Sequence, residues 1–427
     1  MQSACRMADE HPPEKPSVVK VFGRTGSPPC YAVRDFLYRN DIPFEWVEIR
    51  TNDEARAHGV ESASSDRLPV CVFADGTRVE RPTIRSIAEK LGWFHDPLLS
   101  EYDLAIYGAG PAGLSAAVYG ASEGLRTVVI ERWAVGGQAG SSPKIENYLG
   151  FPQGISGAEL AERAREQACR FGAEILIARE GVRGEFSAGK RVGYLSDGSR
   201  VVARAAICAT GVEYYRLPVP DEERLRGAGV YYGAGAGEAA LCIGHPVVVV
   251  GGGNSAAQAT LHFSRYAPHV TLLVRGNSLK STVSAYLVDR IYAAKNVEVL
   301  TNTELTALEG DQVLDAVVVK NNKTGEQRTL ATHWLFVCIG GSPRTEWAVE
   351  AGVRRDEAGY LVTGTDLLDE RGPSDWPLER PPYHLETNVP GLFAAGDVRH
   401  GSVKRCASAV GEGAMAVTFV HRYLADG

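Results

Sequence analysis

Several common signatures are missing from this sequence. No Cys-x-x-Cys motif occurs, which excludes the sequence signature of a local redox dithiol and of a zinc knuckle. The eight cysteines are scattered instead, at positions 5, 30, 71, 169, 208, 242, 338 and 406. Cys208 and Cys338 each stand among apolar residues on an expected strand, so we expect most of the cysteines to be small core residues.

Positive charge and long apolar runs are also scarce. The net charge is −7 and no run of Lys and Arg occurs, which argues against nucleic acid as a partner. No apolar run approaches the length that spans a membrane, so no membrane partner is expected. Residues 1–16 are polar and lack the apolar centre of a signal peptide, so we expect a loose tail there and a cytoplasmic protein.

What the chain does contain is two glycine-rich dinucleotide fingerprints. Its 427 residues, 44% apolar and 23% charged, predict a globular protein of two to four domains. One fingerprint, Gly108-Ala109-Gly110-Pro111-Ala112-Gly113, follows the apolar strand 104–107, and the other, Gly251-Gly252-Gly253-Asn254-Ser255-Ala256, follows the strand 247–250. Such glycines allow the tight turn, the approach of a pyrophosphate and the packing of helix on strand. Two nucleotides in one chain suggest internal electron transfer.

The residues that follow each fingerprint differ in charge. After the first, the strand 127–130 ends in Glu131, at the spacing of an acid that binds ribose hydroxyls, with Arg132 beside it. After the second, the strand 270–274 ends in Arg275, with Lys280 nearby. Cations there suit a 2′-phosphate. The alternative for Arg275 and Lys280 is an ordinary solvated loop.

The region 17–97 forms a separate unit. Its expected order is strand, helix, strand, then strand and helix, and three stretches carry a resemblance: Ser27-Pro28-Pro29-Cys30, Ile42 to Val47, and Leu68-Pro69-Val70. They resemble a glutaredoxin or thioredoxin-fold domain. That family has a Cys-Pro-x-Cys motif where this chain has Ser27-Pro28-Pro29-Cys30, and the first cysteine of that motif is the nucleophile. In this chain the nucleophile's position is occupied by Ser27. Cys30 is therefore a candidate catalytic thiol, and the alternative is an inert structural or docking module.

The rest of the chain resembles the low-molecular-weight thioredoxin reductase family of flavoproteins, in a branch without the dithiol. The matching stretches are Gly136-Gly137-Gln138, Glu146-Asn147-Tyr148, Ala209-Thr210-Gly211, the strand ending in Gly396-Asp397, and Arg405-Cys406-Ala407. The resemblance implies an α/β protein in which two Rossmann-like domains interleave: an FAD domain from 98–212 and 334–427, and an NAD(P)H domain from 213–333. It also implies a homodimer.

The same resemblance assigns the ligand residues. FAD would lie along Gly108, Gly110, Pro111, Ala112, Gly113, Glu131, Arg132, Gly137, Gln138, Asn147, Gly396, Asp397, Arg405, Cys406 and Ala407. NADPH would lie along Gly251, Gly253, Asn254, Ser255, Ala256, Arg275 and Lys280.

The family's Cys-x-x-Cys-Asp motif falls on Ala234-Gly235-Ala236-Gly237-Glu238, so both cysteines are missing. No thiolate can attack a flavin from this loop. Glu238 keeps the acid and is a candidate catalytic proton donor, with an exposed loop carboxylate as the alternative.

Three functions remain open. The first is an NADPH-dependent flavin reductase that passes electrons to a small disulfide, a quinone or dioxygen. The second is a reductase of a one-electron protein carrier of the ferredoxin type. The third is a sensor that binds FAD and NADPH without catalysis.

Overall fold

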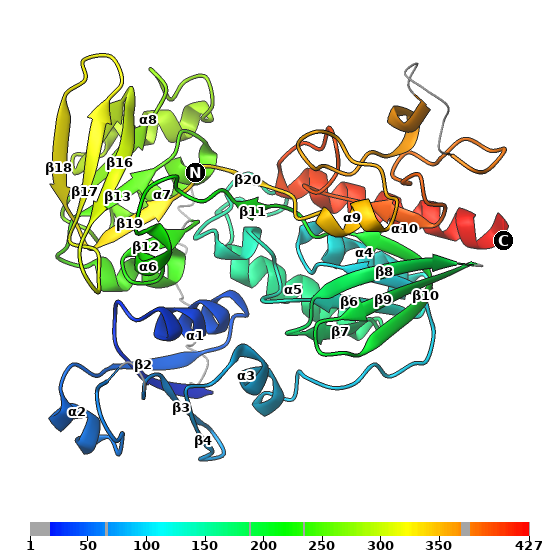
Figure 1. Ribbon diagram of the computed structural model, residues 1–427, viewed down its shortest axis with the longest axis horizontal. Helices are drawn as coiled ribbons and strands as arrows, with labels where there is room; N and C mark the ends of the chain where they lie inside the picture. The colour runs from blue at the N-terminus through cyan, green and yellow to red at the C-terminus, as the bar shows by residue number, and fades with distance from the viewer. Residues whose placement is uncertain (1–17, 65–66, 188, 234, 369–375, 427) are drawn as a thin grey trace, which may run out of the picture.

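The computed structural model describes residues 18–64, 67–187, 189–233, 235–368 and 376–426. They form three lobes, with the N-terminal lobe packed beneath the other two (Figure 1). Among the described residues no helix is both long and apolar enough to cross a membrane. The expected tail 1–16 lies outside the described residues.

The N-terminal lobe is a four-stranded mixed sheet with helices. Its strand order is β2-β1-β3-β4, with β1 parallel to β2 and antiparallel to β3. The Leu68–Pro69 bond before β3 is cis. Its elements are β1 (Val19–Gly23), α1 (Pro28–Arg39), β2 (Phe44–Glu48), α2 (Asn52–Ala57), β3 (Val70–Phe73), β4 (Arg78–Glu80) and α3 (Ile84–Lys90).

The first nucleotide domain is built on a sheet of order β7-β6-β5-β10-β9-β8, with β21 added beside β10. Helix α10 packs against α4 on this sheet. Its elements are β5 (Tyr102–Tyr107), α4 (Pro111–Ser122), β6 (Thr127–Glu131), η1 (Ala139–Ser141), α5 (Gly157–Arg170), β7 (Glu174–Ile177), β8 (Gly181–Ser187), β9 (Lys190–Leu195), β10 (Arg200–Cys208), α9 (Glu346–Glu350), η3 (Gly364–Leu368), β21 (Leu392–Ala394) and α10 (Cys406–Asp426).

The second nucleotide domain holds a parallel sheet of order β12-β19-β13-β14-β15 and a three-stranded antiparallel sheet, β16-β17-β18. Its elements are α6 (Glu222–Leu225), β12 (Val230–Tyr232), η2 (Ala236–Cys242), β13 (Val247–Val250), α7 (Asn254–Phe263), β14 (Val270–Val274), α8 (Ala285–Ala293), β15 (Val297–Thr301), β16 (Thr303–Glu309), β17 (Ala316–Asn321), β18 (Gln327–Ala331) and β19 (Trp334–Val337).

The two nucleotide domains interleave as expected, but one boundary differs. The strand that begins at Trp334 was expected to open the returning part of the first domain. Instead β19 pairs with β12 and β13 inside the second domain. The chain crosses back only afterwards, where β11 (Glu213–Tyr214) and β20 (Gly341–Ser342) form the two-stranded link between the domains.

Candidate functional site

The first fingerprint forms an anion-binding turn between β5 and α4. Gly108 has φ +103°, and a Cβ there would lie 2.5 Å from the carbonyl oxygen of Ala209. A Cβ on Gly113 would lie 1.8 Å from the carbonyl oxygen of Gly108, so only glycine fits at both positions. Gly110 is the N-cap of α4 and offers no side-chain cap, and Pro111 follows. The first amides of α4 are therefore left for a phosphate.

Glu131 is fixed at the edge of this turn. Its carboxylate is buried and accepts hydrogen bonds from the backbone amides of Ala109 and Trp133, both at 2.8 Å. This location, at the end of β6 beside the glycine turn, suits a group that binds ribose hydroxyls. Arg132 points elsewhere and makes ion pairs with Glu213 and Glu180.

A second wall of the site comes from the segment after β6. A Cβ on Gly137 would lie 3.0 Å from the Cα of Gly110, so the two backbones approach each other closely. The side-chain amide of Gln138 donates to the carbonyl of Val212 at 2.5 Å. Asn147 lies farther along this segment and is exposed.

The third wall comes from the C-terminal part of the chain. The amide of Gly396 donates to the carboxylate of Glu412 at 2.7 Å, and Lys404 donates to the carbonyl of Asp397 at 2.6 Å. Burial raises the pKa of Asp397, although Lys404 opposes the shift. Cys406 opens α10, and burial, reinforced by Asp397, raises its thiol pKa to about 11.

Arg405 and Ala407 flank Cys406 and are exposed. At neutral pH the Cys406 thiol is protonated, which argues for a packing role.

These three walls fit FAD on structural grounds. The glycine backbones at 108, 113 and 137 leave no room for side chains, and the unclaimed amides of α4 and the fixed carboxylate of Glu131 supply ligands for phosphate and ribose. Among the described residues no cluster of side chains could hold a metal ion.

The second fingerprint forms a similar glycine turn, but different side chains lie at its edge. Gly251 has φ +151°, and a Cβ there would lie 2.3 Å from the carbonyl oxygen of Cys338. Gly253 is the N-cap of α7 without a side-chain cap, and Ala256 is fully buried under the turn.

The polar residues of this second site lie around the turn. The side chain of Asn254 is tied to Ser284, at the start of α8, by hydrogen bonds of 2.8 and 3.1 Å. Ser255 is exposed, as are Arg275 and Lys280 after β14. The site therefore combines helix amides that have no side-chain cap with exposed cations, an arrangement that suits anionic phosphate groups.

The loop in the place of the dithiol packs against helix α1 of the N-terminal lobe. Ala234 lies outside the described residues, and Gly235 has φ +54°. Glu238 is 2% exposed and pairs with Arg34 of α1 at 2.5 Å. Burial raises the pKa of Glu238, and Arg34 opposes that rise. The alternative of an exposed loop carboxylate is therefore wrong, while a catalytic role for Glu238 stays a prediction.

Cys30 lies on α1 with no exposed surface. Its sulfur accepts a hydrogen bond from the amide of Arg24 at 3.4 Å, and burial raises its pKa. A nucleophilic cysteine needs access and a lowered pKa. The environment of Cys30 therefore favours the structural alternative over a catalytic thiol.

Residues on and just after α1 also reach this site, and they are not among the site residues predicted from the sequence. The carboxylate of Asp35 accepts from the indole nitrogen of Trp133 at 3.1 Å, and Arg39 donates to the carbonyl of Gly137 at 2.5 Å. Asn40 accepts from the amide of Val135 at 3.1 Å. Charged residues in a helix normally signal a solvated face, so no sequence signal marked them.

Comparisons with known proteins agree with this geometry. A family model described as pyridine nucleotide-disulphide oxidoreductase matches residues 102–413. A thioredoxin reductase of Treponema pallidum is 36% identical over 333 residues, 76% of this chain and 98% of its own. The 34.2 kDa protein in the rubredoxin operon of Clostridium pasteurianum is 34% identical over 332 residues, 76% of this chain and 97% of its own.

A solved structure extends the likeness to the fold. The Lactococcus lactis thioredoxin reductase in its FR conformation superposes with a TM-score of 0.67 at 30% identity, covering 76% of this chain and 100% of that one. The family match begins at residue 102, directly after the N-terminal lobe.

Proposed function

Because this chain belongs to the pyridine nucleotide-disulphide oxidoreductase family, and within it is a thioredoxin reductase-like flavoprotein oxidoreductase, we propose that it transfers electrons from NADPH through FAD to an external acceptor. The observation that carries the proposal is the pair of glycine turns, which have side chains of opposite charge at their edges. The first is closed by the buried carboxylate of Glu131, and the second is open beside the exposed Arg275.

FAD bound at the first turn would supply two-electron chemistry between NADPH and the acceptor. The chain binds and positions the two nucleotides. The amides of α4 and α7 hold the phosphates, Glu131 holds the ribose, and Arg275 and Lys280 hold the 2′-phosphate. The loop 235–238 supplies no thiol, so the acceptor must take electrons directly from the flavin rather than through an internal dithiol.

The N-terminal lobe is proposed to be a glutaredoxin-like domain without thiol chemistry. Its sheet order, β2-β1-β3-β4, supports the first part. The second part follows from its two cysteines: both are fully buried, and burial raises the pKa of Cys71 to about 12. A homodimer follows from the family resemblance, and sedimentation or light scattering would test it.

The decisive experiment mixes the purified FAD-loaded protein with NADPH without oxygen and follows the oxidised flavin absorbance. Fast bleaching supports the proposal. A control with NADH should bleach it much more slowly, because NADH lacks the 2′-phosphate. Bound FAD and NADPH without bleaching would instead support the sensor function and reject the reductase.

A second candidate is a reductase of a small protein electron carrier. The observation in its favour is the clostridial relative, whose description places it in a rubredoxin operon. Steady-state turnover with NADPH should be compared for rubredoxin, ferredoxin, a small disulfide, a quinone and dioxygen. A rate with rubredoxin or ferredoxin at least tenfold above the others would favour the carrier; the reverse would favour a small acceptor.

A further inference from the structure

Helix α1 of the N-terminal lobe contacts both nucleotide-binding domains. On one side Asp35, Arg39 and Asn40 hold the segment 133–137, which forms a wall of the first site. All three contacts are hydrogen bonds to fixed groups: two backbone groups and one indole nitrogen. The geometry of that wall therefore depends on the position of α1.

Other residues of α1 pack against the second nucleotide domain. The Arg34–Glu238 pair is buried, with side chains only 5% and 3% exposed. The ring of Tyr31 lies 4.9 Å from that of Tyr231, which stacks on Phe336 in β19. A Cβ on Gly237 would lie 3.4 Å from the Cβ of Tyr38. These contacts join α1 to the loop and the sheet of the second domain.

The N-terminal lobe is also anchored to the first domain through its connecting segment. The fully buried side chain of Arg179 pairs with Asp197 at 2.6 Å, donates to the carbonyl of His95 at 2.5 Å and lies 4.0 Å from the ring of Phe94. The amide of Leu98 donates to Glu174 at 3.0 Å. The lobe is therefore held to the first domain at two places, the connecting segment and α1.

One direct contact between the nucleotide domains shows how they face each other. Arg290 of α8 pairs with Glu146 at 2.7 Å, beside Asn147 of the proposed FAD site. Helix α8 is in turn tied at Ser284 to Asn254 of the second fingerprint. The second fingerprint is thus connected to the proposed FAD site through two side-chain contacts, Asn254 with Ser284 and Arg290 with Glu146.

We propose that α1 is a clamp that holds the two nucleotide-binding domains in the one arrangement used for hydride transfer, with Arg34 and Arg39 as its positioning residues. The proposal rests on the proposed function. Its logic is that a loop without a dithiol has no thiol to present to the flavin, so the contact that α1 makes with Gly237 and Glu238 can be permanent.

A disulfide across the clamp tests whether it opens. The 3.4 Å separation at Tyr38 and Gly237 lies close to the Cβ distance of about 3.5–4.5 Å in disulfides. The double variant Tyr38→Cys, Gly237→Cys is oxidised with copper phenanthroline, and peptide mapping identifies the bond. Flavin bleaching by NADPH is then timed in the oxidised and re-reduced forms, with each single variant as a control.

The clamp predicts that the disulfide forms and that the two forms bleach within about twofold of each other. Bleaching that slows more than tenfold in the oxidised form, and recovers on reduction, would overturn the clamp. Failure of the disulfide to form in folded protein would also overturn it. Wild-type protein is run alongside: no bleaching there rejects the proposed function itself, whereas a loss confined to the cross-linked form rejects only the clamp.

Breaking the clamp gives the complementary test. Arg34→Met should slow bleaching at saturating NADPH at least tenfold while the Kd for NADPH changes less than threefold, and Arg34→Lys should recover much of the rate. Arg224→Met, which removes an exposed ion pair of the second nucleotide domain, is the control and should bleach normally. A folded Arg34→Met protein that bleaches at the wild-type rate would contradict the assignment of Arg34.

Discussion

Arg275 and Glu131 occupy corresponding positions in the two nucleotide-binding domains. Each lies at the end of the strand that follows the fingerprint helix. Arg275 is exposed after β14, whereas the carboxylate of Glu131 is held by two backbone amides. We therefore propose that one side chain at each place decides whether a nucleotide with or without a 2′-phosphate is favoured.

Arg275→Glu should abolish the preference for NADPH over NADH. A hydrogen bond to a charged group contributes about 1.5–3 kcal/mol, which is roughly 10- to 150-fold in kcat/KM. The measurement is kcat/KM with both nucleotides and a common acceptor. Arg275→Lys keeps the charge and should retain most of the preference. An unchanged preference in the Glu variant would remove Arg275 from the 2′-phosphate site.

Single residues also show what sequence can and cannot reveal. Glu131, Gly113 and Gly251 could be predicted to lie at the two turns because a local motif with fixed spacing places them there, whereas their ligand roles stay predictions. Arg34 could not, because its partner Glu238 is 204 residues away and the helix that carries it looks like a surface helix. Only the packing of one domain on another makes its charge buried.

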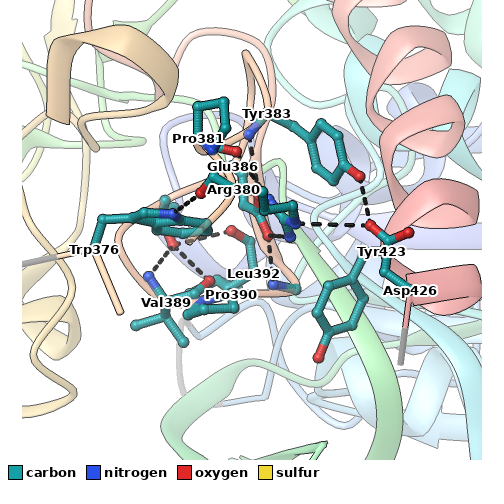
Figure 2. A network of polar contacts seen from close by, with 12 residues as sticks. Trp376, Arg380, Pro381, Tyr383, Glu386, Val389, Pro390, Leu392, Tyr423 and Asp426 are labelled. Atoms are coloured by element: carbon teal, nitrogen blue, oxygen red, sulfur yellow. Dashed lines mark hydrogen bonds and ion pairs between the residues drawn. The ribbon is translucent and has the colours of Figure 1, made fainter. Parts of the chain in front are cut away.

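At the scale of elements, the segment that leads into β21 is held by one buried carboxylate (Figure 2). Glu386 is fully buried and accepts from both terminal nitrogens of Arg380, at 2.8 and 3.0 Å. It also accepts from the amides of Tyr383 and Gly391, both at 3.0 Å. Arg380 in turn lies over the ring of Tyr383, whose hydroxyl donates to Asp426 at the end of α10.

Arg380→Met should destabilise the protein strongly, because it leaves the Glu386 carboxylate buried without its cation. Breaking a buried pair in this way costs about 3–5 kcal/mol. The measurement is the free energy of unfolding in urea. Arg85→Ala, which removes an exposed i,i+4 pair with Glu89, is the control and should cost under about 0.5 kcal/mol. Equal losses in the two variants would contradict the importance of the Glu386 network.

At the start of β5, the pair formed by Asp103 and Arg126 makes the free energy of unfolding depend on pH. Asp103 accepts three hydrogen bonds from Arg126, which lower its pKa to about 2. Because the pKa is lowered on folding, this stabilisation is present above about pH 4 and is lost as the pH falls toward 2. With solvent screening it amounts to about 1 kcal/mol. Asp103→Asn should therefore flatten the acid limb of a plot of unfolding free energy against pH; an unchanged limb would contradict this.

Elements with a strong local pattern matched their predictions, and those defined by distant pairing did not. The strands 247–250 and 270–274 occur as expected, because each is a buried apolar run. The three-stranded sheet β16-β17-β18 was not expected, since its strands are half-exposed and mixed in composition. The assignment of β19 to the second domain depends on which strands it pairs with, which no local pattern specifies.

At the scale of the whole molecule, the N-terminal lobe shares its contacts with both other lobes. We expect it to unfold together with them in one calorimetric transition. Arg179→Met, which releases the connecting segment, should split off an earlier transition, whereas Arg56→Met, at an exposed pair on α2, should not. Two separate transitions in the wild-type protein would show that the lobe is energetically independent.

The covered loop at 235–238 has a consequence for outside partners. A tethered domain faces its binding surface at an effective concentration that short linkers raise to about the millimolar range. Any free protein that sought the same loop would have to compete with this permanent occupant. A soluble thioredoxin at micromolar concentration would therefore lose that competition. The chain would then not exchange electrons with surrounding thiol and disulfide proteins through this loop.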